Sequence, residues 1–268
     1  MRYKLKETMK NFIIIVILFA GILSSAYILQ NQPENKSKQA NELLYFPSGT
    51  FIREVSLDYK TTMTNLMWLQ VVQYYGQHLM TDKDLHQLYN LFNIITDLDP
   101  YFKQCYVFGG TIITYDQKRP DLGLNLLKKG MANLPDSWEI PFITGFIYYI
   151  YEKDYFAAYK WFEFASYKPD APDYCKKFAA SAMKRKGDFI TALRLWTQIY
   201  ENSNNRMEKE NVVANIIYLI EMDFNSILKE KGLEKTSIYI NQQIKDLTFL
   251  PFSVKVKVLT DTVIVEQK

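Results

Sequence analysis

The chain is poor in the residues on which catalysis and metal binding depend. Its 268 residues include two histidines and two cysteines, and they contain no Gly-rich phosphate loop, Gly-x-Ser-x-Gly elbow or His-Glu-x-x-His motif. His78 and His86 flank Asp82 and Asp84, which leaves a His/Asp metal site or polar turn residues as interpretations. Metal sites need three or four convergent ligands, which favours the turn. We therefore predict no catalytic residue, no metal site and no cofactor, and we expect that the protein is not an enzyme.

The chain also carries little net charge and few glycines. The formal net charge is +3, and the first ten residues, with four basic side chains against Glu7, already account for it. The rest of the chain therefore has no net charge that would indicate a basic face, and we predict no nucleic-acid partner. Ten glycines against 17 Phe and 20 Tyr favour helical packing over a turn-rich β protein. A hydrophobic content of 48% is ample for a buried core.

One long uncharged run, residues 12–29, is present near the N-terminus. As a helix it would extend ~27 Å, close to the ~30 Å hydrocarbon core of a bilayer. The basic residues before it predict an N-terminus in the cytoplasm and a C-terminal domain outside, in the periplasm. A cleaved signal peptide ending near Ser24–Ala26 is the alternative, but the apolar run continues through Tyr27–Leu29 and favours an uncleaved anchor. We thus expect a single-pass protein of the cytoplasmic membrane that contacts the lipid bilayer through residues 12–29.

One spacing of about 34 residues recurs between residues 65 and 202. Two helices of about 12–15 residues and two short turns fill such a period, so the spacing predicts repeated helix pairs. Small residues let paired helices approach, large residues fill the space between them, and proline ends the second helix. The recurring positions are small residues in the first helix (Gly76, Gly110, Gly145, Ala179), small residues in the second helix (Gly123, Ala157, Ala192), large residues (Phe92, Leu127, Trp161, Trp196) and closing prolines (Pro100, Pro135, Pro169).

These positions resemble the tetratricopeptide repeat (TPR) family, and with the N-terminal run they resemble its membrane-anchored bacterial members. The unit Trp138–Lys168 matches best, Tyr101–Leu134 matches next, and the outer two units are degenerate. The matching residues of the best unit are Gly145, Tyr148, Ala157, Trp161, Ala165 and Pro169. The resemblance implies an all-α fold, an α-solenoid of about four TPR-like helix pairs.

The chain after the repeats is predicted to add helices and a small β-hairpin. Met207–Lys231 is amphipathic, Gly232 is a helix-ending residue, and Leu233–Leu247 reads as a further helix. Val254–Val258 alternates valine with lysine, and a second strand follows at Val263–Val265. A lone hairpin is only marginally stable, so it either packs on the helices or pairs with another chain. The sequence leaves both open.

Five segments follow from these patterns. Residues 1–11 are a basic cytoplasmic N-terminus, 12–29 the transmembrane helix, 30–53 a linker and packing segment, 54–231 the TPR-like helical domain, and 232–268 the C-terminal helix plus β-hairpin. Within the third segment, Glu42–Ile52 is otherwise apolar around a turn at Phe46–Gly49, and we expect Glu42–Ile52 to pack on the first helix.

The two cysteines, Cys105 and Cys175, are 70 residues apart, in equivalent places two repeats apart. Stacked repeats advance on the order of 10 Å each. Disulfide-linked Cα atoms must lie within about 7 Å, so we predict two buried free thiols rather than a disulfide.

The family resemblance also implies a concave groove, lined by the first helix of each pair, that binds a protein or an extended peptide. Amide and hydroxyl groups there would suit a peptide backbone, and a solvated groove without a ligand is the alternative. The candidate groove residues are Gln70, Gln73, Gln77, Gln104, Thr111, Thr114, Glu139, Phe142, Tyr149, Asp173, Lys176 and Lys184.

These observations predict a membrane-anchored scaffold for protein–protein interaction in a bacterial envelope assembly. The alternative is an accessory or regulatory subunit of a membrane enzyme or transport complex. A free-standing enzyme with its site in the groove is the least favoured interpretation.

Overall fold

The computed structural model describes Ser24 and residues 59–260 and 262–267. The chain divides into two compact units, Met1–Pro47 and Ser48–Lys268, and the fold described below belongs to the second. The predicted linker segment 30–53 lies outside the described residues.

The predicted membrane localisation requires correction. The span at residues 12–29 lies outside the described residues, apart from Ser24. In the part of the chain that the structure describes, no helix is both long and apolar enough to cross a bilayer. Helix α4 (Lys60–Met80) has 21 residues, but Gln70, Gln73 and Gln77 interrupt its apolar positions. The prediction of a single-pass protein of the cytoplasmic membrane, with a periplasmic domain and a bilayer partner, is therefore withdrawn.

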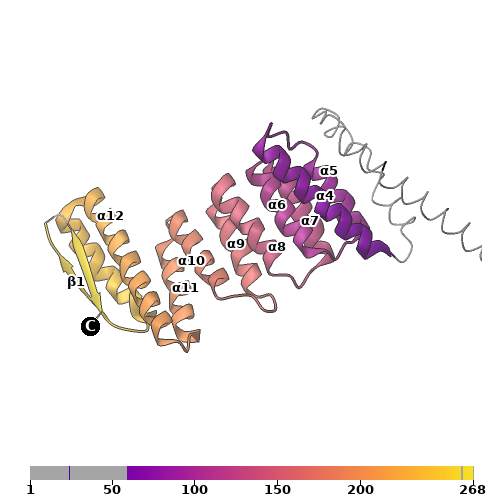
Figure 1. Ribbon diagram of the computed structural model, residues 1–268. Coiled ribbons are helices and arrows are strands. Elements are labelled where there is room, and N and C mark those ends of the chain that lie inside the picture. The colour runs from indigo at the N-terminus through magenta and orange to yellow at the C-terminus, as the bar shows by residue number, and fades with distance from the viewer. Residues whose placement is uncertain (1–23, 25–58, 261, 268) are drawn as a thin grey trace, which may run out of the picture. The chain divides into compact units, whose positions relative to one another are not determined.

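Residues 60–202 form helices that pack in sequence order, as Figure 1 shows. Each helix contacts the next, and helices two apart also meet at α5/α7 and at α6/α8. This arrangement of stacked helix pairs confirms the predicted TPR-type repeat fold. After α4 the elements are α5 (Leu88–Leu98), α6 (Lys103–Tyr115), α7 (Pro120–Asn133), α8 (Glu139–Ile147), the π-helical turn η3 (Tyr148–Glu152), α9 (Tyr155–Ser166), α10 (Tyr174–Lys186) and α11 (Phe189–Asn202).

The helix boundaries follow from local capping chemistry. Pro120 occupies the first turn of α7, where its missing N–H costs nothing. Asp154 and Asp188 precede α9 and α11, and their carboxylates accept hydrogen bonds from the backbone N–H groups of Ala157 and Thr191. Gly187, with φ 84°, ends α10 in the left-handed region that glycine adopts without strain.

Two predicted glycines lie at close helix contacts, and a third does not. A Cβ on Gly110 would lie 2.7 Å from Leu127 Cγ, and a Cβ on Gly145 would lie 2.8 Å from the Phe162 ring. A Cβ on Gly76 would meet nothing within 4 Å. Gly76 is therefore not the equivalent of Gly110, and the predicted register of the first unit was wrong. Helix α4 instead buries Met67, Val71, Tyr74 and His78.

Helix α12 (Arg206–Asp246) is a helical hairpin rather than one rod. Its backbone breaks at Gly232, where φ is 75° and ψ is 175°. The rings of Phe224 and Tyr239 lie 6.3 Å apart. Along a straight helix these residues would be separated by ~22 Å, so the second half folds back on the first. The two predicted helices on either side of Gly232 are confirmed.

The C-terminal hairpin packs on this helix pair. Strands β1 (Val254–Val258) and β2 (Val263–Gln267) are antiparallel, with Val256 opposite Val265. The side chain of Asn225 in α12 accepts from Val263 N at 2.8 Å and donates to Val263 O at 3.0 Å, while Glu221 accepts from Val265 N at 2.9 Å. These bonds occupy the outer edge of β2. Of the two alternatives for the hairpin, the structure shows packing on the helices.

Both cysteines are free and buried, as predicted. Cys105 lies in α6 and Cys175 in α10, each with no exposed surface. Burial raises the pKa of the Cys105 thiol well above its ordinary value and raises that of Cys175 to about 11.

Candidate protein-binding groove

An open hollow of about 590 Å³ lies where α4, α6 and α8 meet. Its walls come mainly from one face of α6, where Gln104, Val107 and Thr111 recur three and four residues apart. Three of the predicted groove residues, Gln104, Thr111 and Glu139, lie together in it. We name it the α6 hollow, and it is lined by Trp68, Lys103, Gln104, Val107, Phe108, Thr111, Ile112 and Glu139.

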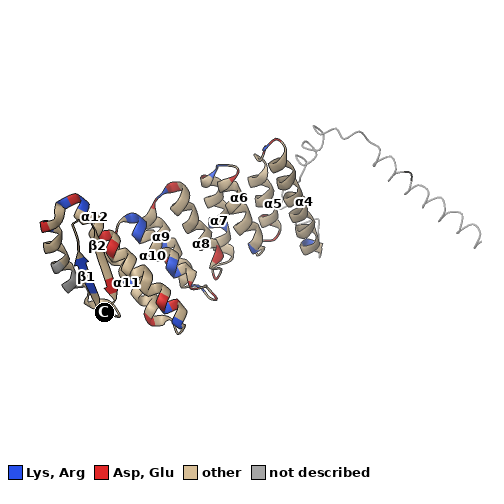
Figure 2. Ribbon diagram, turned by 60° about the vertical axis from the view of Figure 1, so that its left-hand side comes forward, with Lys and Arg blue, Asp and Glu red and all other residues tan. Residues whose placement is uncertain are grey.

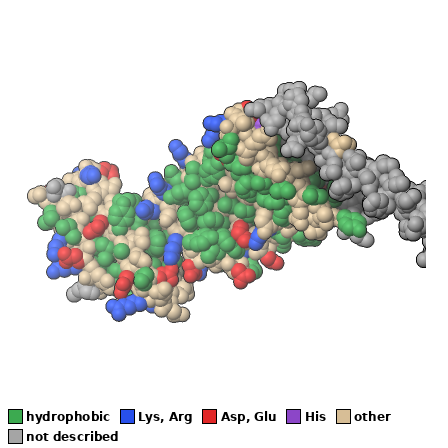
Figure 3. Space-filling model, in the orientation of Figure 1, with side chains coloured by type: hydrophobic (Ala, Val, Ile, Leu, Met, Phe, Trp, Pro, Cys, Tyr) green, Lys and Arg blue, Asp and Glu red, His purple; other side chains and the backbone are tan. Residues whose placement is uncertain are grey.

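The floor of the α6 hollow is apolar and rigidly packed. The Trp68 ring lies edge-on to Phe108 with centroids 5.4 Å apart, and Phe92 lies behind both at 6.3 Å. Such edge-to-face aromatic pairs are favourable beyond their buried area. Figure 3 shows that hydrophobic side chains gather on the side of the helices drawn there, around α8 and α9. The packed rings of Trp68 and Phe108 therefore offer an apolar surface to a group that enters the hollow.

The rim of the hollow carries one ion pair. Lys103 Nζ donates to Glu139 Oε1 at 2.6 Å, and Ser137 Oγ donates to Glu139 Oε2 at 2.8 Å. Partial burial alone would raise the pKa of Glu139, but hydrogen bonds from Lys103, from its own backbone and from Ser137 outweigh burial and lower it. Glu139 is therefore ionised and paired at neutral pH. The rim offers balanced charge rather than a free anion or cation.

Two predicted groove residues are buried instead, which corrects their assignment. Thr114 has no exposed surface, and its hydroxyl donates to Gly110 O at 2.8 Å where α6 packs on α7. Phe142 is 8% exposed and sits among Phe162 and Phe178, with ring centroids 5.3 and 5.4 Å away. Both fill the space between helices, so a partner cannot reach Thr114 and reaches little of Phe142.

The three glutamines of α4 lie on another side of that helix. Trp68 and Tyr75 contact Phe108, so their side of α4 faces α6. At about 100° per residue, Gln70 and Gln77 lie roughly 160° and 180° around the helix from Trp68. Gln70, Gln73 and Gln77 are exposed, but they turn away from α6. The structure does not bring them into the α6 hollow, because the register based on Gly76 was wrong.

The remaining predicted residues are dispersed along α8 to α10. Tyr149 is half-buried against Tyr155, with centroids 5.6 Å apart, in the π-helical turn after α8. Lys176 lines a separate hollow of about 150 Å³ between α9, α10 and α11. Lys184 Nζ lies 4.9 Å from the centroid of the Tyr218 ring. Asp173 is exposed before α10. These four residues do not share one cavity with Gln104 and Thr111.

Sequence reasoning missed the apolar lining of the hollow. Val107 lies between Gln104 and Thr111 at helical spacing, so periodicity alone could have found it. Trp68 could not be found from the repeats, because its place depends on the true register of α4. The structure therefore changes the expected chemistry from a polar groove to an apolar hollow with a polar rim.

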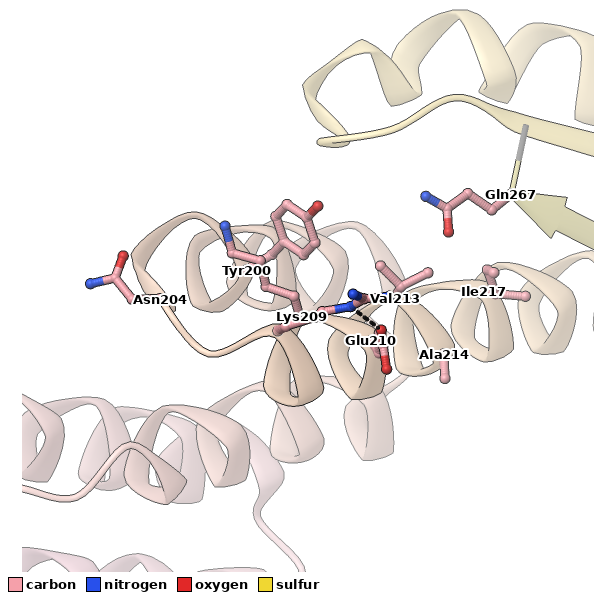
Figure 4. A pocket seen from close by; sticks show the side chains of 9 residues that line it. Tyr200, Asn204, Lys209, Glu210, Val213, Ala214, Ile217 and Gln267 are labelled. Atoms are coloured by element: carbon pink, nitrogen blue, oxygen red, sulfur yellow. Dashed lines mark hydrogen bonds and ion pairs between the residues drawn. The ribbon is translucent and has the colours of Figure 1, made fainter.

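A second hollow, of about 620 Å³, lies between the end of α11, the start of α12 and β2. Figure 4 shows Tyr200, Lys209 and Glu210 on one side and Gln267 on the other. Its charges are already partnered: Arg206 Nε donates to Glu210 Oε1 at 3.0 Å, and Lys209 Nζ lies 4.8 Å from the Tyr200 ring centroid. No predicted site residue lines it.

The histidines form local pairs. His78 Nδ1 lies 2.6 Å from Asp82 Oδ1, and His86 Nδ1 is in contact with Asp84 Oδ1. Within residues 59–260 and 262–267, no three His, Cys, Asp or Glu side chains are placed to hold a metal ion. Figure 2 shows charges of both signs mixed over the helices in the view drawn.

Comparisons with known proteins assign the chain to no family. No protein-family model matches the chain, and no curated protein matches it. A similar solved structure is the "Crystal structure of MamA protein", with a TM-score of 0.43 and 13% identity over 70% of this chain and 92% of that chain. A likeness with a TM-score of 0.43 is too weak to assign a fold. The TPR-type fold rests on the stacked helix pairs and on the close contacts at Gly110 and Gly145.

Proposed function

We propose that the protein is a non-catalytic scaffold that binds a segment of a partner protein in the α6 hollow. The observation that carries the proposal is the open, largely apolar hollow of about 590 Å³ whose lining includes the polar side chains of Gln104 and Thr111. Predicted membrane anchoring is no part of the proposal, and neither is the envelope assembly that depended on it.

The size and chemistry of the hollow suit side chains of a peptide. Pockets that bind ligands typically have volumes of about 300–1,000 Å³ and mostly apolar walls. Val107, Phe108 and Trp68 offer an apolar surface to an aliphatic or aromatic side chain. The exposed Gln104 amide can both donate to and accept from a peptide backbone. The Thr111 hydroxyl donates to Val107 O at 2.7 Å, which leaves its oxygen to accept.

Site-specific crosslinking in the host cell tests the proposal. A photoreactive residue at Gln104 is compared with one at Lys160, an exposed position on α9 that does not line the hollow. We expect the Gln104 probe to capture a partner protein that the Lys160 probe does not. Capture of the same proteins by both probes would count against the hollow.

Binding by the purified protein then tests the apolar contact. Val107→Asp places a charge in the apolar wall of the hollow and should weaken affinity for the captured segment at least about tenfold, equivalent to ~1.4 kcal/mol. Lys160→Asp, a charge change away from the hollow, should leave affinity within about twofold, since distant exposed charges are screened. Unchanged binding by Val107→Asp would refute the proposal.

A second candidate, an accessory subunit of a larger complex, is favoured by one observation on α9. Phe156 and Phe164 are 42% and 45% exposed. Lys160 Nζ lies 4.6 Å from the Phe156 ring centroid, and Lys168 Nζ lies 4.1 Å from that of Phe164. Capture from Lys160 alone would favour packing through this surface over binding in the hollow.

A further inference from the structure

The outer edge of strand β1 is open to a further strand. Within the described residues the sheet has two strands, so β1 pairs with β2 along one edge only. The second edge of β2 is occupied by α12, through the bonds of Asn225 and Glu221 to Val263 and Val265. Among the residues that the structure describes, no hydrogen bond occupies the second edge of β1.

The register of the ladder shows which backbone groups of β1 point outward. In an antiparallel ladder, two opposite residues either exchange both N–H···O bonds or exchange none. The bonds of Val263 and Val265 to α12 point away from β1, so these residues exchange none with their opposites, Val258 and Val256. The N–H and C=O groups of Val256 and Val258 therefore point away from β2, and those of Val254 follow by the same alternation.

The side chains of β1 differ between its two faces. The three valines are partly buried and pack against the hydrophobic core, whereas Lys255 and Lys257 are exposed. Lys257 Nζ lies 2.8 Å from Glu266 Oε1, and Lys255 has no ion pair in the part of the chain that the structure describes. The exposed face at this edge therefore carries a net positive charge.

We propose that β1 binds an extended segment of a partner protein as a third strand, and that acidic and apolar residues alternate in this segment. The backbone of such a strand donates to and accepts from the outward groups of the valines. Its apolar side chains lie on the face of the valines, and its acidic side chains lie beside the lysines. This site is separate from the α6 hollow and goes beyond the function proposed for it.

The lysines favour a different protein over a second copy of this chain. In a fully overlapping antiparallel pair of two β1 strands, each Lys255 would lie opposite a Lys257. Like charges directly opposite each other destabilise a sheet, and lysines on an edge strand oppose pairing between like strands. An acidic segment meets no such repulsion and pairs with the lysines instead.

Peptide binding to the full chain tests the proposal. The probe is a fluorescent peptide of about eight residues, a common strand length, in which valine and glutamate alternate. It should bind at least about tenfold more tightly than a peptide in which valine and lysine alternate, because opposite charges meet across the strands. Lys255→Gln combined with Lys257→Gln should remove most of that difference. No binding of the glutamate peptide at about 1 mM, or equal binding of the two peptides, would overturn the proposal.

Lys60→Gln combined with Lys128→Gln is the matched control. Both lysines are exposed on other helices, and their removal changes the net charge by the same amount. The preference for the glutamate peptide should stay within about twofold of that of the unaltered protein, since distant charges are screened. An equal loss in both double variants would indicate general charge attraction and would overturn the proposal.

Residue-resolved amide exchange locates the bound peptide without altering the chain. In the free protein, the amides of Val256 and Val258 should exchange faster than those of Lys255 and Lys257, which donate to β2. A saturating concentration of the glutamate peptide should slow exchange at Val256 and Val258 at least about tenfold. Unchanged exchange there would overturn the proposal. Val107→Asp should leave the affinity for this peptide within about twofold, and a larger loss would show that the peptide binds in the α6 hollow instead.

Discussion

The backbone of Gly145 lies directly against the ring of Phe162, since a Cβ atom at Gly145 would be 2.8 Å from two ring carbons. Gly110 stands in the same relation to Leu127, also 17 residues later, at 2.7 Å from Leu127 Cγ. Contacts under 3.0 Å leave no room for a methyl group in a close-packed interior. These glycine–large residue pairs set the distance between the two helices of a unit.

Gly145→Ala should therefore destabilise the fold. Overpacking of a core typically costs about 1–3 kcal/mol, and the Phe162 ring is fully buried, which limits its freedom to move. Urea denaturation of the full chain measures the change in the free energy of unfolding.

The matched control for Gly145→Ala is Gly76→Ala, in the interior of α4 with open space around it. That substitution should raise stability by about 0.5–1 kcal/mol, because alanine favours helix over glycine. Equal effects of the two substitutions would contradict the assigned contacts.

Asn225 should hold the C-terminal hairpin on α12. Its side chain bonds both the N–H and the C=O of Val263. Asn225→Ala leaves these backbone groups without their partner and should cost about 1–3 kcal/mol. Faster amide exchange at Val263 and Val265 should accompany the loss.

Asn215→Ala provides the comparison for Asn225. Asn215 is exposed on the same helix, and its side chain donates only to Asn211 O within that helix. Its removal should change stability by less than about 0.5 kcal/mol. If both alanine variants left exchange at Val263 unchanged, the hairpin would be held on α12 without a contribution from Asn225.

The sequence predicted the repeats best where two helices bury a common surface. At Gly110 and Gly145 the spacing reflects a physical contact, so periodicity found it. At Gly76 the same spacing was accidental. The first helix of the stack packs on fewer neighbours, and a weaker constraint leaves a weaker pattern.

The site was less predictable than the fold, for a physical reason. Whether a residue such as Gln73 faces the α6 hollow or turns away from it depends on the rotation of its helix, and a shift of one residue turns the side chain by about 100°. The family pattern does not fix that rotation when a unit is degenerate. The packing of the hairpin was equally inaccessible, since Asn225 lies 38 residues before Val263.

The two thiols should be unreactive in the folded protein. Burial raises the pKa of both Cys105 and Cys175, so both are thiols rather than thiolates near pH 7. Neither side chain is exposed, so a reagent in solution cannot reach the sulfur atoms. Titration with a thiol-specific reagent should detect almost no thiol in native protein and both in denaturant. Rapid reaction of either cysteine without denaturant would show that α6 or α10 opens readily.

Asp223 should make stability depend on pH in an unusual direction. Burial raises the pKa of its carboxyl, and the hydrogen bond from the Tyr239 hydroxyl offsets this only in part. The folded state therefore disfavours the ionised form, so the charge costs stability above the raised pKa. That cost fades as pH falls through the raised pKa towards the unfolded value of about 3.9. Asp223→Asn removes the charge and should make the protein more stable at pH 7, with a gain that shrinks on acidification.

Asp121→Asn is the control for Asp223→Asn, because the hydrogen bond from Arg119 lowers the pKa of that exposed carboxyl and neutralisation should bring no gain. Denaturant titrations at pH 7 and pH 4 distinguish the two, and a gain from Asp223→Asn that is the same at both pH values would exclude buried charge as its cause.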